Sequence, residues 1–155
     1  MNDAHIHIAL NHFPLIVPII GVFLLLAAYG LKSEVLKRAA LLLFVFGGLT
    51  AYPAYESGEN AEEIVEEIRG VEHEYINKHE EDAETFSLLS YILAAVAFLS
   101  FLASWRKFPF SSVLSVGTLL FSVIVIYYGV LTGTSGGEIR HPEVRQDGIQ
   151  VLYKD

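Results

Sequence analysis

The sequence predicts an all-α fold, a four-helix transmembrane bundle with a short helical cap on its outer face. Composition is the first reason, because 53% of the 155 residues are hydrophobic and only 18% are charged. The second reason is that the apolar residues gather in four uncharged runs, over residues 13–31, 39–55, 86–105 and 110–131. About 20 apolar residues form a helix that crosses roughly 30 Å of hydrocarbon. A helix satisfies its own backbone hydrogen bonds in lipid, so we treat residues 1–155 as a single membrane domain.

The charged residues predict the orientation of this bundle. The two short connections carry a single acid, Glu34, and five basic residues: Lys32, Lys37, Arg38, Arg106 and Lys107. Short loops rich in Lys and Arg face the cytoplasm. We therefore expect a multi-pass membrane protein with both termini on the outer, non-cytoplasmic side. The N-terminus has no basic stretch before its first apolar run, so we expect that run to remain as an anchor.

Composition also excludes several partners and cofactors. The net charge of −8 argues against nucleic acid, whose phosphates require clustered Lys and Arg. The chain has no cysteine, which excludes disulfides, thiolate-held iron–sulfur clusters and covalently attached c-type haem. The partners that we expect are the lipid bilayer and either other membrane subunits or a redox partner on the outer face.

The connection between the second and third spans, residues 57–84, predicts the outer cap. Asn60 followed by Glu63 is the pattern of a capping box, which starts a helix. From about Val71 the helical pattern continues without a break into the third span. His79 shares a face of this extension with apolar residues, so we expect its ring to point toward the bundle. Those apolar residues are Tyr75, Ile76, Ala83 and Phe86.

The outer tail, residues 132–155, follows the fourth span. Its first part, residues 132–137, consists of glycine, serine and threonine and predicts a flexible link. Such a link would let His141 fold back over the mouth of the bundle. Asp147 and Gly148 precede alternating apolar residues, so the closing segment predicts a small hairpin.

Histidines are the residues on which a functional hypothesis depends. All six lie in the segments expected outside: His5, His7, His12, His73, His79 and His141. His12 and His79 each precede a span that enters from the same face, so we expect them to be the primary ligands. Two or three imidazoles can form a transition-metal site, or two can take both axial positions of haem b.

Carboxylates can complete or orient such a site. Glu59, Glu63, Glu80 and Glu143 can serve as further ligands or can fix the imidazole tautomers. The structural alternative is that interfacial histidines are amphipathic anchors and that residues 59–67 form a solvated helix face. His5 and His73 fit this alternative best. No H-E-x-x-H or EF-hand pattern is present to decide between the two.

Four strings of the chain resemble a family of small uncharacterised bacterial four-span inner-membrane proteins, a domain of unknown function. The strings are HIALNHFP at residues 7–14, GENAEE at 58–63, HE at 79–80 and GGEIRHPE at 136–143. The resemblance covers nearly the whole chain and implies the same topology, but no activity. It singles out His7, His12, His79 and His141 among the histidines.

The leading functional hypothesis is that histidines at the outer end bind a transition metal or b-type haem, for electron transfer or metal handling. His12 and His79 would be the first ligands, followed by His7 and His141. A non-catalytic accessory or assembly subunit of a larger membrane complex, such as a respiratory complex, is the alternative. A membrane enzyme that uses a His/Glu pair as acid and base is a third class, and catalysis is not what we expect.

The orientation is open to a direct test. A reporter that is active only in the cytoplasm, fused after Asp155, should be inactive, because the basic loops place both termini outside. The same reporter inserted after Lys107 should be active and serves as the control. An active fusion at the C-terminus would reverse the topology.

Overall fold

The computed structural model describes residues 2–66 and 72–145, and no strand occurs among them. The elements in order are α1 (Asp3–Leu10), α2 (Phe13–Gly30), α3 (Glu34–Glu59), α4 (Glu62–Glu66), α5 (His73–Trp105), α6 (Ser111–Arg140) and the 3₁₀ helix η1 (Pro142–Val144). Four helical segments, the first being α1 together with α2, are long and apolar enough to cross a membrane. The predicted all-α fold with four spanning helices is confirmed.

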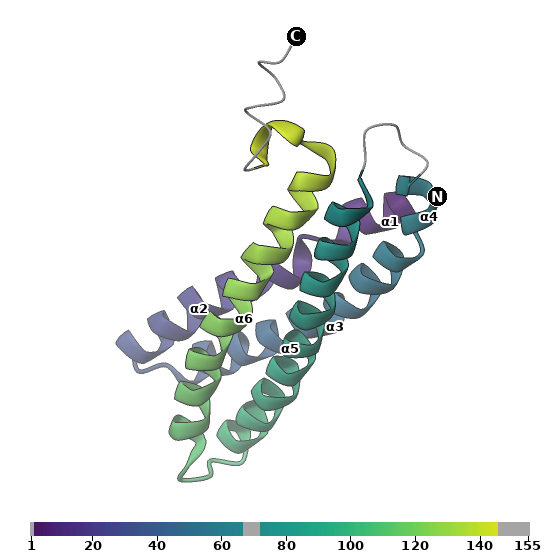
Figure 1. Ribbon diagram of the computed structural model, residues 1–155. Coiled ribbons are helices and arrows are strands. Elements are labelled where there is room, and N and C mark those ends of the chain that lie inside the picture. Colours follow the sequence, from purple (N-terminus) through teal and green to yellow (C-terminus); the bar gives the residue numbers. More distant parts are fainter. Residues whose placement is uncertain (1, 67–71, 146–155) are drawn as a thin grey trace.

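The long helices are arranged as two hairpins. α2 packs against α3, and α5 packs against α6. α3 also packs along α5, whereas α2 and α6 share a smaller contact. Figure 1 shows the α2–α3 pair crossing the α5–α6 pair at an angle, with α1 and the last turns of α6 toward the same end. The contact between α3 and α5 is therefore the main joint between the hairpins.

Small residues allow α3 to approach its neighbours closely. A Cβ added at Gly48 of α3 would lie 2.5 Å from both the Ser90 carbonyl oxygen and the Ala94 Cβ of α5. On the adjacent residue, a Cβ at Gly47 would lie 2.7 Å from Cγ of Pro18 in α2. Lipid tails are as apolar as the side chains that they touch, so close packing, rather than escape from water, holds membrane helices together.

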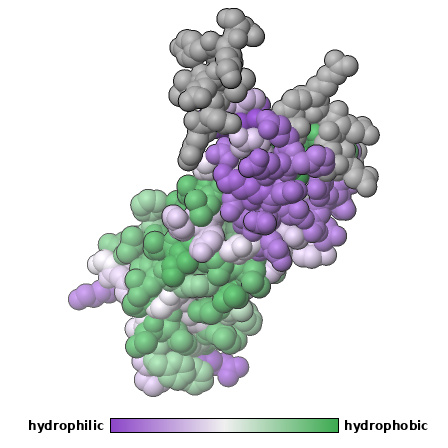
Figure 2. Space-filling view, viewed as in Figure 1, coloured by the Kyte–Doolittle hydropathy of each residue, from purple (hydrophilic) through white to green (hydrophobic). Residues whose placement is uncertain are grey.

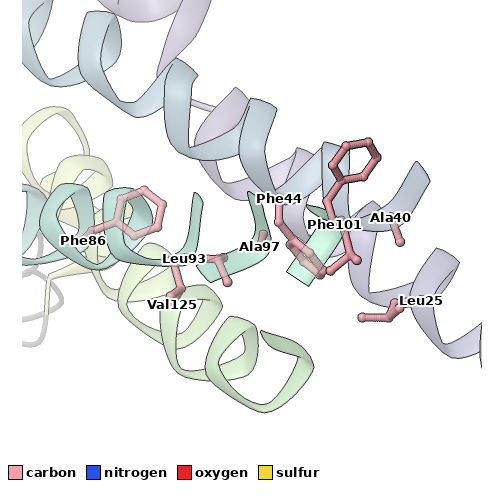
Figure 3. Packing of buried hydrophobic residues seen from close by; sticks show 9 residues of the cluster. Leu25, Ala40, Phe44, Phe86, Leu93, Ala97, Phe101 and Val125 are labelled. Carbon is pink, nitrogen blue, oxygen red and sulfur yellow. The ribbon is translucent and has the colours of Figure 1, made fainter. Parts of the chain in front are cut away.

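The buried core follows these contacts (Figure 3). It is formed by Leu25 of α2; Ala40, Leu41 and Phe44 of α3; Phe86, Leu93, Ala97 and Phe101 of α5; and Val125 of α6. Several hydroxyls at the α5–α6 contact are satisfied by other protein groups. Ser100 and Thr118 are 2.8 Å apart at their side-chain oxygens, which satisfies both groups away from water.

The outer surface of the spans is apolar, and most of the polar surface is gathered at one end (Figure 2). Figure 2 shows a hydrophobic body under a hydrophilic cap. Exposed apolar side chains occur on all four helices, among them Phe23, Leu49, Leu99 and Leu120, each at least 60% exposed. Water would penalise this surface, whereas lipid would not. The chain is accordingly a multi-pass membrane protein.

Helix α3 is longer than predicted and changes how the cap begins. It runs to Glu59, and Asn60 is its C-terminal capping residue. The predicted capping box at Asn60 is therefore wrong, because Ala61 directly precedes α4 and its carbonyl accepts from the Ile64 and Val65 amides. α1 packs over this part of α3, which favours its continued helical form. The side chain of Glu63 lies outside the described residues.

The predicted flexible link after the fourth span is also wrong, because α6 continues unbroken to Arg140. Contacts with α5 override the low helix propensity of this glycine-rich stretch. The Thr132 hydroxyl donates to the Asp82 carbonyl of α5 at 3.0 Å, and Ser135 is buried.

In contrast, the predicted extension of the third span is confirmed, since α5 begins at His73 and is continuous. The predicted hairpin lies outside the described residues.

The α3–α5 contact generates a stability prediction. Gly48→Ala should destabilise the protein by about 1–3 kcal/mol, because the new methyl meets backbone that must move. Gly117→Ala is the matched control, since nothing lies within 4 Å of a Cβ built there. Thermal unfolding in detergent, followed by circular dichroism, measures the difference. Equal stability of the two variants would contradict the packing described here.

Candidate functional site

Two histidines face each other at what we call the histidine end, where α1, the last turns of α3 and α6, and the first turns of α5 meet. His7 comes from α1 and His79 from α5. Their ring centroids are 6.5 Å apart, and the ring planes are inclined by 82°. Both side chains are half-buried. The structure thus brings together the imidazoles of two histidines that are 72 positions apart in the chain (79 − 7).

Each ring is held through its Nδ1 atom. Nδ1 of His7 lies 2.9 Å from the Ala54 carbonyl oxygen of α3. A carbonyl only accepts, so this contact assigns the hydrogen to Nδ1 and leaves Nε2 as the basic nitrogen. Nδ1 of His79 lies 3.3 Å from the Ser135 hydroxyl of α6, and the Thr132 carbonyl is a further acceptor beside this ring.

Two glycines make room for the rings. A Cβ at Gly58 of α3 would lie 3.0 Å from Cε1 of His7, and a Cβ at Gly136 of α6 would lie 2.9 Å from Cε1 of His79. Each imidazole therefore packs directly against the backbone of a facing helix. These glycines are the signal that sequence reasoning missed, because they stand in the GENAEE and GGEIRHPE strings without an assigned role there.

The pair differs from the expected one, since the structure places His7, and not His12, beside His79. His12 is exposed and its ring contacts the Asn11 side chain. The cause is α1, an unpredicted helix that ends at Leu10 and lies on α3. Residue 12 caps the start of α2, while residue 7 lies inside the contact between α1 and α3.

The remaining expected ligands are on the surface. His141 is exposed and its Nδ1 lies 2.9 Å from Oε1 of Glu143, so it does not cover the bundle mouth. The backbone amide of Glu143 and the His141 ring lower the pKa of that carboxyl below its usual value. Glu59 and Glu80 are exposed, as are His5 and His73. Among the described residues, no group of three or more His, Asp or Glu side chains is close enough to hold a metal ion.

Arg145 joins the segment after α6 to the start of α5. Arg145 is 7% exposed, and its Nε donates to the Glu138 carbonyl at 2.8 Å. One terminal nitrogen of Arg145 donates to Oε1 of Glu72 at 2.7 Å. The guanidinium carbon of Arg145 lies 3.8 Å from the centre of the Tyr75 ring. Lys78 adds an ion pair to the Glu138 carboxylate at 2.7 Å. These contacts fasten the end of α6 and η1 to the first turns of α5.

The 6.5 Å separation of the His7 and His79 rings is that of an edge-to-face ring contact, which spans about 4.5–7 Å, and two ligands of one metal can lie at a similar distance. Imidazole nitrogens bind metals at about 2.0–2.1 Å, so two rings on opposite sides of one metal have centres roughly 6 Å apart. The observed 6.5 Å is close to this value.

Comparisons with family models, with curated proteins and with solved structures find no match for this chain. The chain is thus described by its fold and site, as a four-span helical membrane protein with a histidine pair at one end.

The cap generates its own prediction. Arg145→Met should speed hydrogen exchange of the Val144 amide by about tenfold or more, because it removes charge-assisted hydrogen bonds that hold η1 on α5. Arg140→Met removes the same charge from an exposed site and is the control. Mass spectrometry of exchanged peptides measures both. Equal exchange in the two variants would show that the Arg145 contacts do not hold this segment.

Proposed function

We propose that the protein binds a transition metal or haem b between His7 and His79, for electron transfer or metal handling at a bacterial inner membrane. The observation that supports this most is the 6.5 Å separation of two imidazoles whose Nδ1 atoms are already engaged. Metal-binding histidines commonly donate their second ring hydrogen to a carbonyl or another protein group. The contact between His7 and the Ala54 carbonyl has this form.

Rigidity supports the same proposal. Both rings stand on helices, and each packs against helix backbone through Gly58 or Gly136. Ligands on packed helices keep their geometry before the metal arrives, whereas ligands on a tail must first be ordered. His141 and His12 lack this support because both side chains are exposed. We therefore reduce the proposed ligand set to His7 and His79.

Haem b fits the two-histidine set better than a bare ion does. A haem brings four nitrogens of its own, so two imidazoles complete its coordination, and it supplies a one-electron couple when bound. A zinc or copper ion would need further ligands. The two acids expected as ligands, Glu80 and Glu59, are exposed, and their carboxylates would have to turn inward. His7 and His79 would hold the group, and their packing against helix backbone at Gly58 and Gly136 would fix their positions.

The accessory-subunit reading stays as the second candidate. It is favoured by the absence of a third ligand from the described part of the chain and by the hydrophilic surface of the histidine end in Figure 2. In this reading the rings would be packing elements. Protein that is colourless and free of metal after purification would favour it.

The test is metal analysis and an absorption spectrum of the purified full-length protein and its variants. His7→Ala and His79→Ala should each abolish the haem band or the bound metal, whereas His12→Ala and His73→Ala should retain it. Occupancy should also fall on acidification, because binding needs neutral imidazole.

Two adjacent glycines provide a sharper control. Gly136→Ala should lower occupancy by displacing the His79 ring, while Gly137→Ala should not, because nothing lies within 4 Å of a Cβ at Gly137. Both changes add one methyl group to the same turn of α6. Loss of ligand in both variants, or in neither, would argue against a site that depends on the position of His79.

A further inference from the structure

The opposite end of the bundle, which we call the basic end, contains a hollow lined by two basic residues and one acid. It has a volume of about 250 Å³ and lies where α3 begins, α5 ends and α6 begins. Its lining residues are Glu34, Arg38, Ser104, Lys107, Phe108 and Ser111. Three elements thus contribute polar groups to one space at the edge of the apolar body.

The only carboxylate in this lining is already engaged. Oε1 of Glu34 lies 2.6 Å from Nζ of Lys37, whose side chain is buried. Oε2 of Glu34 accepts from the Ser104 hydroxyl at 3.1 Å. Both Lys37 and Arg38 interact with the charge of Glu34. With Lys107, three cations face one carboxylate, and positive charge remains in excess.

Arg38 is held in place by neutral groups. Its Nε donates to the Ser104 side-chain oxygen at 3.1 Å, and one terminal nitrogen donates to the Ser104 carbonyl at 3.0 Å. These bonds fix the guanidinium plane without neutralising its charge. Lys107 is exposed and follows the end of α5 with a φ of 57°, so its position is set by the turn into α6. Ser111, the first residue of α6, donates its amide to the Phe108 carbonyl at 3.1 Å, so the 30-residue helix contributes the positive end of its dipole here.

We propose that this hollow binds a phosphate group, presented by an anionic phospholipid or by a soluble phosphate. A planar guanidinium, an ammonium and a helix N-terminus are the groups that recognise phosphate oxygens. The position favours a lipid, because basic pockets between spans at a membrane surface bind anionic headgroups. Phe108 and Phe110 stack with ring centroids 5.3 Å apart beside the hollow, and both are exposed where acyl chains would begin.

The chain offers a matched pair of lysines for the test. Lys32 and Lys107 are both exposed, and each follows the end of a helix with a positive φ, 51° and 57° respectively. Only Lys107 lines the hollow. Lys107→Gln and Lys32→Gln therefore remove the same charge from the same end of the molecule, but only the first removes it from the proposed site.

The experiment is native mass spectrometry of full-length protein titrated in detergent with phosphatidylglycerol, with phosphatidylcholine and with inorganic phosphate. Wild-type protein should retain phosphatidylglycerol over phosphatidylcholine. Lys107→Gln should weaken that retention by about fivefold or more, and Lys32→Gln by less than about twofold. Thermal unfolding of both variants verifies that each is folded.

Each outcome decides the question. Retention of inorganic phosphate that is lost in Lys107→Gln, without preference for phosphatidylglycerol, supports the site and assigns it to a soluble phosphate. Equal weakening by the two lysine variants overturns the site in favour of general surface charge. Equal retention of the two lipids, with no binding of phosphate, also overturns it. None of these results depends on whether the histidine end binds a metal.

Discussion

The close contact of α3 with α5 is the constraint on which the rest of the structure depends. At its centre Gly48 presses against the backbone of Ser90, with no space for even a methyl group. Because the two helices lie side by side along their length, they position side chains at both ends of the bundle. At one end α3 carries α1 and its His7 toward His79 of α5. At the other, Arg38 of α3 reaches Ser104 of α5.

The two ends use the same physical device for different chemistry. In each, a polar side chain is oriented by an uncharged acceptor on a helix that it packs against: the Ala54 carbonyl for His7 and the Ser104 carbonyl for Arg38. An uncharged partner fixes geometry without neutralising the group, so the imidazole keeps a basic nitrogen and the guanidinium keeps its charge. We therefore propose an electrophile such as a metal as the ligand of the histidine end and an anion as the ligand of the basic end.

The length of the four apolar runs and their lack of charged residues were sufficient to predict the fold. A chain that crosses hydrocarbon of fixed thickness must satisfy its backbone hydrogen bonds internally, which leaves few alternatives to helices. The inward orientation of the His79 ring was also predictable, since His79 shares one face of its helix with a stripe of apolar residues. The position of His7 was not predictable, because the capping residue Asn2 marks the start of a helix but nothing in this segment indicates that the helix lies on α3. The extension of α6 was missed for a related reason: residues 132–137 have poor helix propensity, and contacts such as Thr132 with Asp82 stabilise their helix only after α5 is in place. Glycine marked a flexible link in the sequence, but Gly136 instead provides the space that His79 occupies.

The central claim is that the α3–α5 contact places the ring of His7, and of no other histidine, beside the ring of His79. Solid-state NMR of histidine-labelled protein in lipid bilayers tests it most directly, and a chain with only six histidines can be assigned by single substitutions. The account predicts a cross-peak between the rings of His7 and His79, a hydrogen on Nδ1 of His7, and no cross-peak between His12 and His79. A cross-peak that joins His79 to His12, or no contact between His79 and any histidine, would contradict it.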